Sequence, residues 1–181
     1  MLLQYERPAD QSISVQTKRA EFGQKYYDSY ADKKSAQNSN EEVAELKLIE
    51  AYATKNPCYT ANVNKVDSRY TKFQENGPEG LMLHSVGCPQ PSASVFVKNW
   101  NKESYDRACV HAFIDANTGE VYQLLPWNFR GWHGGGSSNN THVGVEMCEP
   151  SCIKYTSGAS FTCSDLEKAK KAVKTTYDAA V

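Results

Sequence analysis

The stretch Gly80-Leu-Met-Leu-His-Ser-Val-Gly-Cys-Pro89 decides how the rest of this chain is interpreted. It begins as an apolar run and is cut off by a glycine and a proline, a pattern typical of a short buried strand. Side chains alternate along a strand, so His84 is expected on the same face as Met82 and Val86. A histidine at the end of a strand is held by the sheet and still faces open space, which suits a metal ligand or a catalytic base. The alternative is a histidine with a purely structural role.

Three later segments carry residues that can act together with His84. They are His111 in Cys109-Val-His-Ala-Phe-Ile114, Trp132 and His133 before a run of three glycines, and Glu146 in His142-Val-Gly-Val-Glu-Met147. Each residue also has an ordinary structural interpretation. For His111 this is a core histidine hydrogen-bonded to a neighbour, and for Glu146 it is a solvated or salt-bridged strand carboxylate. The recurrence of such segments favours a shared site.

Hydrophobic periodicity predicts strands alternating with helices from residue 56 onward. Expected strands cover 109–114, 120–125 and 142–148, with a hairpin turn at Asp115–Gly119 joining the first two. Expected helices cover 92–100 and the segment from Ser164 or Asp165 to the end. Strands interleaved with helices predict an α/β or α+β fold in which helices cover a sheet.

Residues 1–55 have a different character and are predicted to form a helical N-terminal extension, either a small helical pair or a partly disordered arm. The segment is polar, and its apolar residues have helical spacing. The second of its two expected helices starts near Asn40 and carries Val43, Leu46, Leu48 and Ile49. We find no chemically active group in this extension.

Composition excludes several classes of partner. The 20 Lys and Arg residues nearly balance the 21 Asp and Glu residues, the net charge is -1, and no basic block is present. We therefore expect no nucleic-acid partner. No apolar stretch is long enough to cross a bilayer, so we expect no membrane partner. The first residues lack the basic and apolar regions of a signal peptide.

The six cysteines are too few for a disulfide scaffold in a chain of 181 residues. Reduced thiols are the default expectation. A bridge involving Cys148, Cys152 or Cys163 is compatible with the sequence, but spacing does not identify its partners.

Four motifs follow one another in one order between about Asn56 and Glu149. They are Leu-His-Ser-Val-Gly-Cys-Pro, Cys-Val-His-Ala-Phe-Ile with a turn and Val-Tyr-Gln-Leu-Leu-Pro-Trp, Arg-Gly-Trp-His-Gly-Gly, and Asn-Asn-Thr-His-Val-Gly-Val-Glu. Together they resemble the zinc-dependent N-acetylmuramoyl-L-alanine amidases, cell-wall hydrolases related to peptidoglycan recognition proteins. The likeness is greatest to members from phages and Firmicutes.

The resemblance implies a fold, a reaction and site residues. The fold is a mixed central β-sheet flanked by helices over residues 56–181. The reaction is hydrolysis of the amide between N-acetylmuramic acid and L-alanine of peptidoglycan by zinc-activated water. His84 is then a Zn²⁺ ligand, and Glu146 is the catalytic group that holds or deprotonates the water. Trp132 lines the substrate cleft, and His133 lines it or orients the water, with zinc ligation a lesser alternative for His133. His111, in a motif that the family keeps near the site, is a further candidate for substrate binding.

The sequence departs from the family pattern in its metal ligands. The remaining family ligands, a histidine and an acidic or cysteine residue, lie beyond the helix that starts near Ser164, yet no histidine follows His142. We therefore expect a domain that lacks its C-terminal metal-binding segment. A substitute site built from His84, Cys88 and Cys148 is one alternative.

Two further functions remain open at this stage. One is a non-catalytic module of the same fold that binds peptidoglycan. The other is a cysteine hydrolase with Cys88 as nucleophile and His84 or His111 as base. Without a signal peptide, an amidase of this kind is expected to stay cytoplasmic until lysis, as a phage or prophage lysin, or to be an intracellular recycling enzyme.

Overall fold

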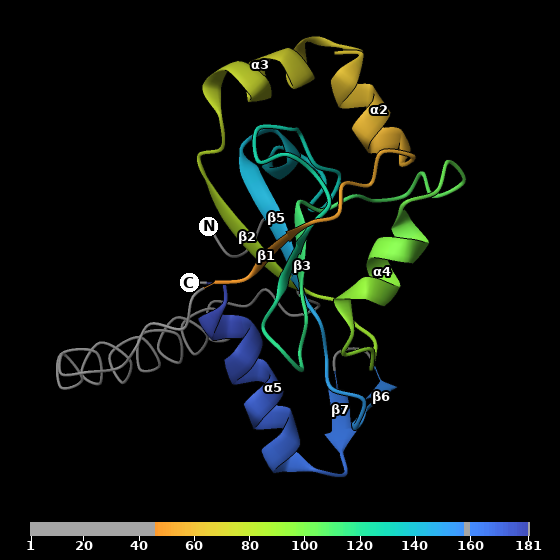
Figure 1. The fold of residues 1–181 in the computed structure, drawn as a ribbon, viewed down its shortest axis with the longest axis vertical. Coiled ribbons are helices and arrows are strands. Elements are labelled where there is room, and N and C mark those ends of the chain that lie inside the picture. The colour runs from red at the N-terminus through yellow and green to blue at the C-terminus, as the bar shows by residue number, and fades with distance from the viewer. Residues whose placement is uncertain (1–45, 158–159, 181) are drawn as a thin grey trace, which may run out of the picture. The chain divides into compact units, whose positions relative to one another are not determined.

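The computed structural model describes residues 46–157 and 160–180, which belong to one compact unit that begins at Leu46. Its centre is a five-stranded sheet in the order β1-β4-β3-β5-β2 (Figure 1). The strands are β1 Leu48–Glu50, β2 Gly80–Ser85, β3 Ala112–Ile114, β4 Val121–Gln123 and β5 His142–Met147. Strands β3 and β4 pair antiparallel and the other neighbours pair parallel. The predicted mixed sheet flanked by helices is confirmed, including the strand that ends near His84.

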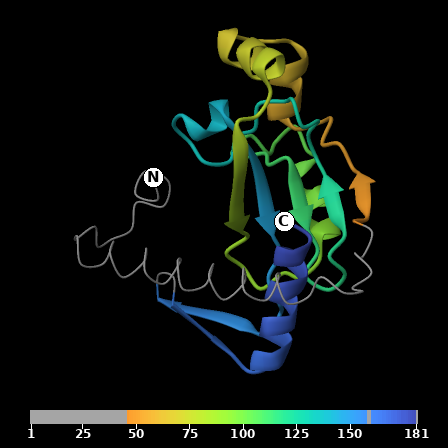
Figure 2. The same cartoon turned by 90° about the vertical axis from the view of Figure 1, so that its left-hand side faces the viewer.

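Helices α4 Ala93–Trp100 and α5 Leu166–Asp178 lie on opposite sides of this sheet (Figure 2). Helices α2 Pro57–Val63 and α3 Ser68–Asn76 lie beyond one end of its strands. Helix α4 packs on the face that bears Phe113, whose ring lies 4.8 Å from the ring centroids of both Phe96 and Trp100. The other face bears Ala112 and Ile114, and the residues after α5 pack there. The sheet is therefore packed on both faces, with a separate cluster of apolar side chains on each face.

Local capping explains where the helices begin. The Asn56 side chain accepts a hydrogen bond from the backbone N–H of Cys58, and Pro57 follows it as the first residue of α2. Asp67 caps α3 in the same way, and Asp165 caps α5 as one of the two predicted residues. Sequence analysis assigned no element to α2 or α3, because both helices are short and their apolar residues are sparse.

The structure corrects the prediction for the N-terminal extension at its end. Leu48, Ile49 and Glu50 form β1, which pairs with β4, rather than part of a helix. Helical spacing over so few residues is a weak signal. The open edge of β4 supplies backbone hydrogen bonds to β1, and the local sequence pattern gives no information about these bonds. The rest of the predicted extension lies outside the described residues.

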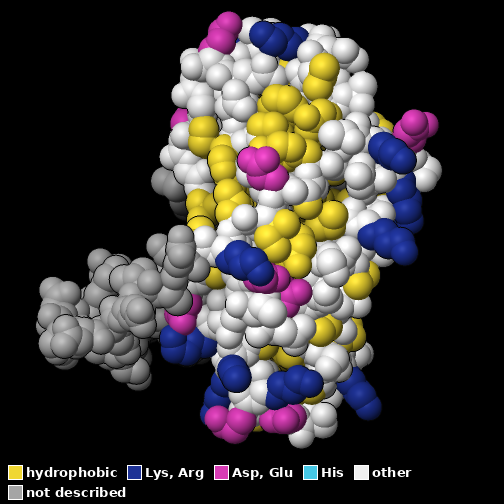
Figure 3. Space-filling model, viewed as in Figure 1, with side chains coloured by type: hydrophobic (Ala, Val, Ile, Leu, Met, Phe, Trp, Pro, Cys, Tyr) yellow, Lys and Arg dark blue, Asp and Glu magenta, His cyan; other side chains and the backbone are white. Residues whose placement is uncertain are grey.

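The two edge strands of the sheet keep apolar surface. Leu48 in β1 is 43% exposed and Leu81 in β2 is 47% exposed. Figure 3 shows apolar side chains in a band on one face of the molecule, with Lys and Arg mainly at its margins.

In the part of the chain that the structure describes, no helix is long and apolar enough to span a bilayer.

A second, two-stranded sheet follows β5 and was not predicted. Strands β6 Ile153–Ser157 and β7 Ser160–Cys163 form an antiparallel hairpin. A disulfide joins Cys152 to Cys163 across it, with the two Cα atoms 5.1 Å apart. The expectation of reduced thiols is therefore wrong for this pair, while the other four cysteines are free.

Candidate active site

His84 and Glu146 lie opposite each other on the neighbouring parallel strands β2 and β5. Paired positions in a sheet present their side chains to the same face, here the face that also bears Phe113, which is the register partner of Glu146. The sheet alone therefore brings the predicted metal ligand and the predicted catalytic carboxylate together. The shared register comes from the parallel pairing, which sequence spacing does not specify.

His133 joins them from the loop before β5. Its Nδ1 lies 3.1 Å from Nε2 of His84, and its Nε2 lies 3.0 Å from the backbone oxygen of His142. A carbonyl oxygen only accepts, so Nε2 carries the hydrogen and Nδ1 presents a lone pair to His84. Burial is the largest of the effects that lower the pKa of His133 to about 4, which keeps the ring neutral at pH 7.

Glycines make room for the His133 ring. A Cβ atom on Gly144 would lie 2.3 Å from Cγ of His133, and one on Gly131 would lie 2.8 Å from its Cδ2. Both distances are far below ordinary contact, so the ring lies directly against the backbone at these two positions. The Asn139 side chain also accepts hydrogen bonds from the backbone N–H groups of His133 and Gly134, both at 2.9 Å. The loop is thereby fixed in place.

Glu146 is the most unusual polar group of the site. Its Oε2 is the one side-chain nitrogen or oxygen atom, among the described residues, that is buried and lacks a hydrogen-bond partner. Burial raises the pKa of this carboxyl to about 7, and the nearby charge of Glu149 adds to the effect. A carboxyl that ionises near neutral pH and has an open oxygen is suited to accept and return a proton.

His111 is completely buried, as the alternative interpretation expected. Its Nε2 donates to the backbone oxygen of Phe129 at 2.6 Å, and its Nδ1 accepts from the backbone N–H of Gly144 at 3.0 Å. Burial lowers the pKa of His111 to about 4, so the ring is neutral. Both ring nitrogens are therefore used within the fold, and the substrate-binding role expected for His111 stays a prediction. His111 holds Gly144, the residue against which His133 rests.

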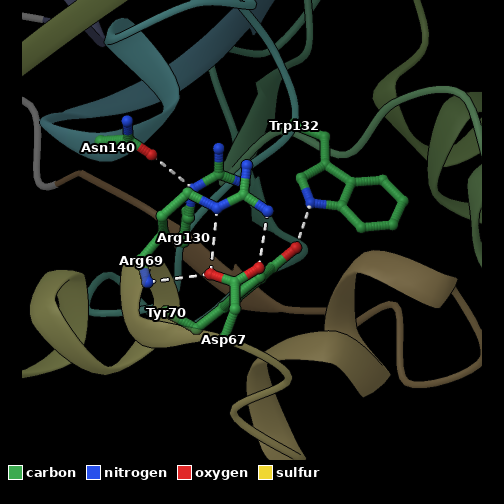
Figure 4. A network of polar contacts seen from close by, with 6 residues as sticks. All are labelled: Asp67, Arg69, Tyr70, Arg130, Trp132 and Asn140. Atoms are coloured by element: carbon green, nitrogen blue, oxygen red, sulfur yellow. Dashed lines mark hydrogen bonds and ion pairs between the residues drawn. The ribbon is translucent and has the colours of Figure 1, made fainter.

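Trp132 lies half-buried beside this site. Its backbone pairs with that of Cys109 through two hydrogen bonds of 2.8 and 2.9 Å, and its indole N–H donates to the hydroxyl of Tyr70 at 2.9 Å (Figure 4). The indole is therefore held in one orientation between the sheet and α3. Its predicted contact with substrate stays a prediction.

The family model for N-acetylmuramoyl-L-alanine amidases matches residues 74–179, more than half of the chain, and the match includes all five predicted site residues. The chain belongs to this amidase family. Members of the family act on peptidoglycan and are generally zinc-dependent. No curated protein matches the chain.

Several solved structures are similar to this chain at low identity. The catalytic domain of XlyA is 20% identical over 68% of each chain, with a TM-score of 0.42. A mutant endolysin from Bacillus subtilis is 21% identical over 68% of each chain, with a TM-score of 0.41. The Staphylococcus aureus hydrolase AmiA, solved in complex with its ligand, is 16% identical over 77% of this chain and 60% of its own, with a TM-score of 0.44. The family assignment depends on the family model and not on these structures.

The described residues of this chain do not supply a complete zinc site. No group of three or more His, Cys, Asp or Glu residues in 46–157 and 160–180 is arranged to hold a metal ion. Two imidazole nitrogens, those of His84 and His133, converge, whereas a catalytic zinc ordinarily has three protein ligands. The substitute site from His84, Cys88 and Cys148 is not formed. His133 is the histidine in contact with His84, and its roles in the substrate cleft and as a zinc ligand both stay predictions.

The same geometry disfavours a cysteine hydrolase. Burial raises the pKa of the Cys88 thiol, and the charges of Glu149 and Glu146 raise it further. A catalytic cysteine needs the thiolate, which these neighbours oppose. His111, one of the two bases considered, has no free nitrogen.

Glu149 is a site neighbour that sequence analysis missed. Its buried carboxylate accepts hydrogen bonds from the Ser85 hydroxyl, from the backbone N–H of Gly87 at 3.0 Å and from the Tyr155 hydroxyl at 2.7 Å. Glu149 therefore ties the segment that follows His84 to the β6–β7 hairpin. The available signal was a second carboxylate three residues after Glu146.

Proposed function

We propose that this chain hydrolyses the amide that links the lactyl group of N-acetylmuramic acid to L-alanine in peptidoglycan. Since the chain belongs to the amidase family, one observation at its candidate active site supports this reaction more strongly than the alternative functions. The buried carboxyl of Glu146 has an unpartnered oxygen and faces the same side of the sheet as His84, which pairs with His133.

Glu146 acts as the general base in this proposal. Its carboxylate takes a proton from the attacking water and later gives it to the leaving amine of L-alanine. A pKa of about 7 suits both steps, because the protonated and ionised forms are similarly populated at neutral pH. The charge of Glu149 and the burial of the site keep the pKa in that range.

His84 and His133 orient the reacting groups. His133 is neutral, donates to the backbone of His142 and presents its lone pair toward His84. The ring cannot turn freely, since Gly144 and Gly131 leave it only the space that it fills. The pair thus presents fixed polar atoms beside the carboxyl of Glu146.

Zinc enters the proposal as the usual cofactor of the family, with His84 as the ligand that the resemblance implies. Because the described residues lack a third donor, we derive no step that depends on the metal. Elemental analysis of the chain purified without chelator, beside His84→Ala, tests this part. Near-stoichiometric zinc that is lost in the variant is expected if the chain binds zinc, and a metal-free wild type contradicts the zinc-activated form of the reaction.

The reaction itself is tested with N-acetylmuramoyl-L-alanyl-D-isoglutamine and with purified cell walls. Mass spectrometry is expected to detect free N-acetylmuramic acid and the released dipeptide, and the release should fall at least about a hundredfold in Glu146→Gln. Lysis of bacteria from outside by the purified chain would agree with a phage or prophage lysin. Release at the same rate from Glu146→Gln would remove Glu146 from the mechanism.

A non-catalytic peptidoglycan-binding module is the second candidate. It is favoured by the lack of a three-ligand metal group among the described residues. Co-sedimentation with purified peptidoglycan, without release of new amino groups even when zinc is added, is the result expected for this candidate. Release of the dipeptide would exclude it.

A further inference from the structure

Two guanidinium groups, those of Arg69 and Arg130, lie near a single carboxylate, that of Asp67 (Figure 4). Arg69 in α3 forms a two-point ion pair with Asp67, with Nε to Oδ1 at 3.0 Å and Nη2 to Oδ2 at 2.6 Å. Both oxygens of Asp67 are therefore occupied by Arg69. Arg130 forms no ion pair within the described part of the chain, so the cluster carries one uncompensated positive charge.

Arg130 is a buried cation that forms no ion pair of its own among the described residues, although its charge helps to lower the pKa of nearby Asp67, which Arg69 already holds. Only 6% of its surface is exposed. Its Nε donates to the amide oxygen of Asn140 at 2.7 Å, and its guanidinium carbon lies 5.2 Å from the centre of the Tyr70 ring (Figure 4). A buried charge is ordinarily paired, because loss of hydration is costly. Asn140 and Tyr70 orient the group without neutralising it.

The terminal nitrogens of Arg130 remain available for a ligand. No described residue accepts a hydrogen bond from them. They also keep some contact with solvent, since Glu146 Oε2 is the single fully buried side-chain polar atom without a partner among the described residues. Guanidinium nitrogens that are fixed and unpaired match the two oxygens of a carboxylate.

We propose that Arg130, with Arg69 beside it, forms a binding site for a ligand carboxylate. The identity of the ligand rests on the proposed function: if the chain acts on peptidoglycan, this group is a carboxylate of the stem peptide. A chain of contacts connects Arg130 with the proposed catalytic site. The Tyr70 ring under Arg130 bears the hydroxyl that receives the indole N–H of Trp132, and Trp132 is adjacent to His133 in the chain. A stem peptide anchored at Arg130 would pass along Trp132.

The test compares two probes that differ only in charge. They are N-acetylmuramoyl-L-alanyl-D-glutamate and its diamide, and calorimetry is done on Glu146→Gln protein so that the probes are not cleaved. We expect the dicarboxylate to bind at least tenfold more tightly, which corresponds to about 1.4 kcal/mol. The preference should shrink as salt is raised, because salt screens charge. Equal affinities for the two probes would overturn the proposal.

Three substitutions locate the effect. Arg130→Gln should abolish the preference. Since that change can disturb the fold, Asn140→Asp is the decisive variant: it places a carboxylate beside Nε of Arg130 with almost no change in shape, so it should reduce the preference while the protein stays folded. Arg107→Gln is the matched control, because Arg107 also lies over a tyrosine ring, that of Tyr105, at 5.6 Å. An unchanged preference in folded Asn140→Asp would overturn the proposal.

The outcomes for the two proposals can be told apart. Cleavage by the wild type without a preference for the dicarboxylate would refute the carboxylate site alone. A clear preference without any cleavage would leave the carboxylate site standing and refute the amidase reaction.

Discussion

Replacement of Gly144 by alanine tests how the His133 ring is seated. The added Cβ would lie 2.3, 2.5 and 2.6 Å from Cγ, Nδ1 and Cδ2 of the ring. Ordinary contacts are about 3.4–4 Å, so the ring has to move by about 1 Å or more. Overpacking of this kind costs about 1–3 kcal/mol. The displaced ring also loses its two hydrogen bonds, at about 0.5–1.5 kcal/mol each. The free energy of unfolding should therefore fall by about 2–6 kcal/mol.

Urea unfolding in the presence of chelator measures this cost, and a double-mutant cycle assigns it. If the clash with His133 is the cause, Gly144→Ala should cost less than about 1 kcal/mol in a His133→Ala background, where the ring is gone. The control is His133→Ala alone, which gives the cost of the two lost hydrogen bonds. An equal cost of Gly144→Ala in both backgrounds would refute the assignment, because the added methyl group would then be meeting something else.

Three other predictions concern stability. The pKa of Glu146 is raised to about 7, so the folded state holds this proton more tightly than the unfolded state, and the free energy of unfolding falls by about 3 kcal/mol as pH rises from about 4.5 through 7. Urea unfolding should therefore show Glu146→Gln more stable than the wild type at pH 8 and not at pH 4.5. A constant difference in the free energy of unfolding at the two pH values would contradict this. The pKa of buried His111 is lowered to about 4, so the stability that this neutral ring contributes above pH 6.5 should be lost as pH falls through 4. An NMR titration of Glu146→Gln protein should show His111 neutral at pH 5, and protonation of His111 near pH 6.5 would contradict the prediction. Removal of the Cys152–Cys163 disulfide by paired serine substitutions should lower the free energy of unfolding by about 2.8 kcal/mol, given the sequence separation of 11 residues. The control, Cys88→Ser, should leave the midpoint of urea unfolding nearly unchanged. Equal midpoints for the two variants would show that the hairpin unfolds independently.

Much of the central fold could be predicted because its signals are local. The run before His84 and the segment around Glu146 are apolar over the length of a strand, and the turn at Asp115–Gly119 joins β3 to β4 as expected. Asp165 caps α5 as one of the predicted residues. Each of these features depends on side chains within a few positions of one another, so the amino-acid pattern contains the information.

Other elements could not be predicted from local pattern. β1 forms because β4 offers an unpaired edge, and its three residues by themselves favour no one structure. Helices α2 and α3 are short, and they are tied to the rest through contacts with distant segments, such as the two hydrogen bonds between the Asn62 side chain and the backbone of Arg130, at 2.6 and 2.9 Å. The β6–β7 hairpin is closed by a disulfide whose pairing depends on which cysteines approach in space.

The sequence by itself determined which residue types are available for chemistry: the histidines, Glu146 and the glycine-rich Trp132–His133 motif, in the order characteristic of the amidase family. Only the tertiary structure decided where each one lies. Parallel pairing of β2 with β5 put His84 opposite Glu146, the space at Gly144 brought His133 to His84, and packing buried His111 completely. Proximity across strands and loss of solvent are properties of the packed chain, because they arise between residues that lie far apart in the sequence.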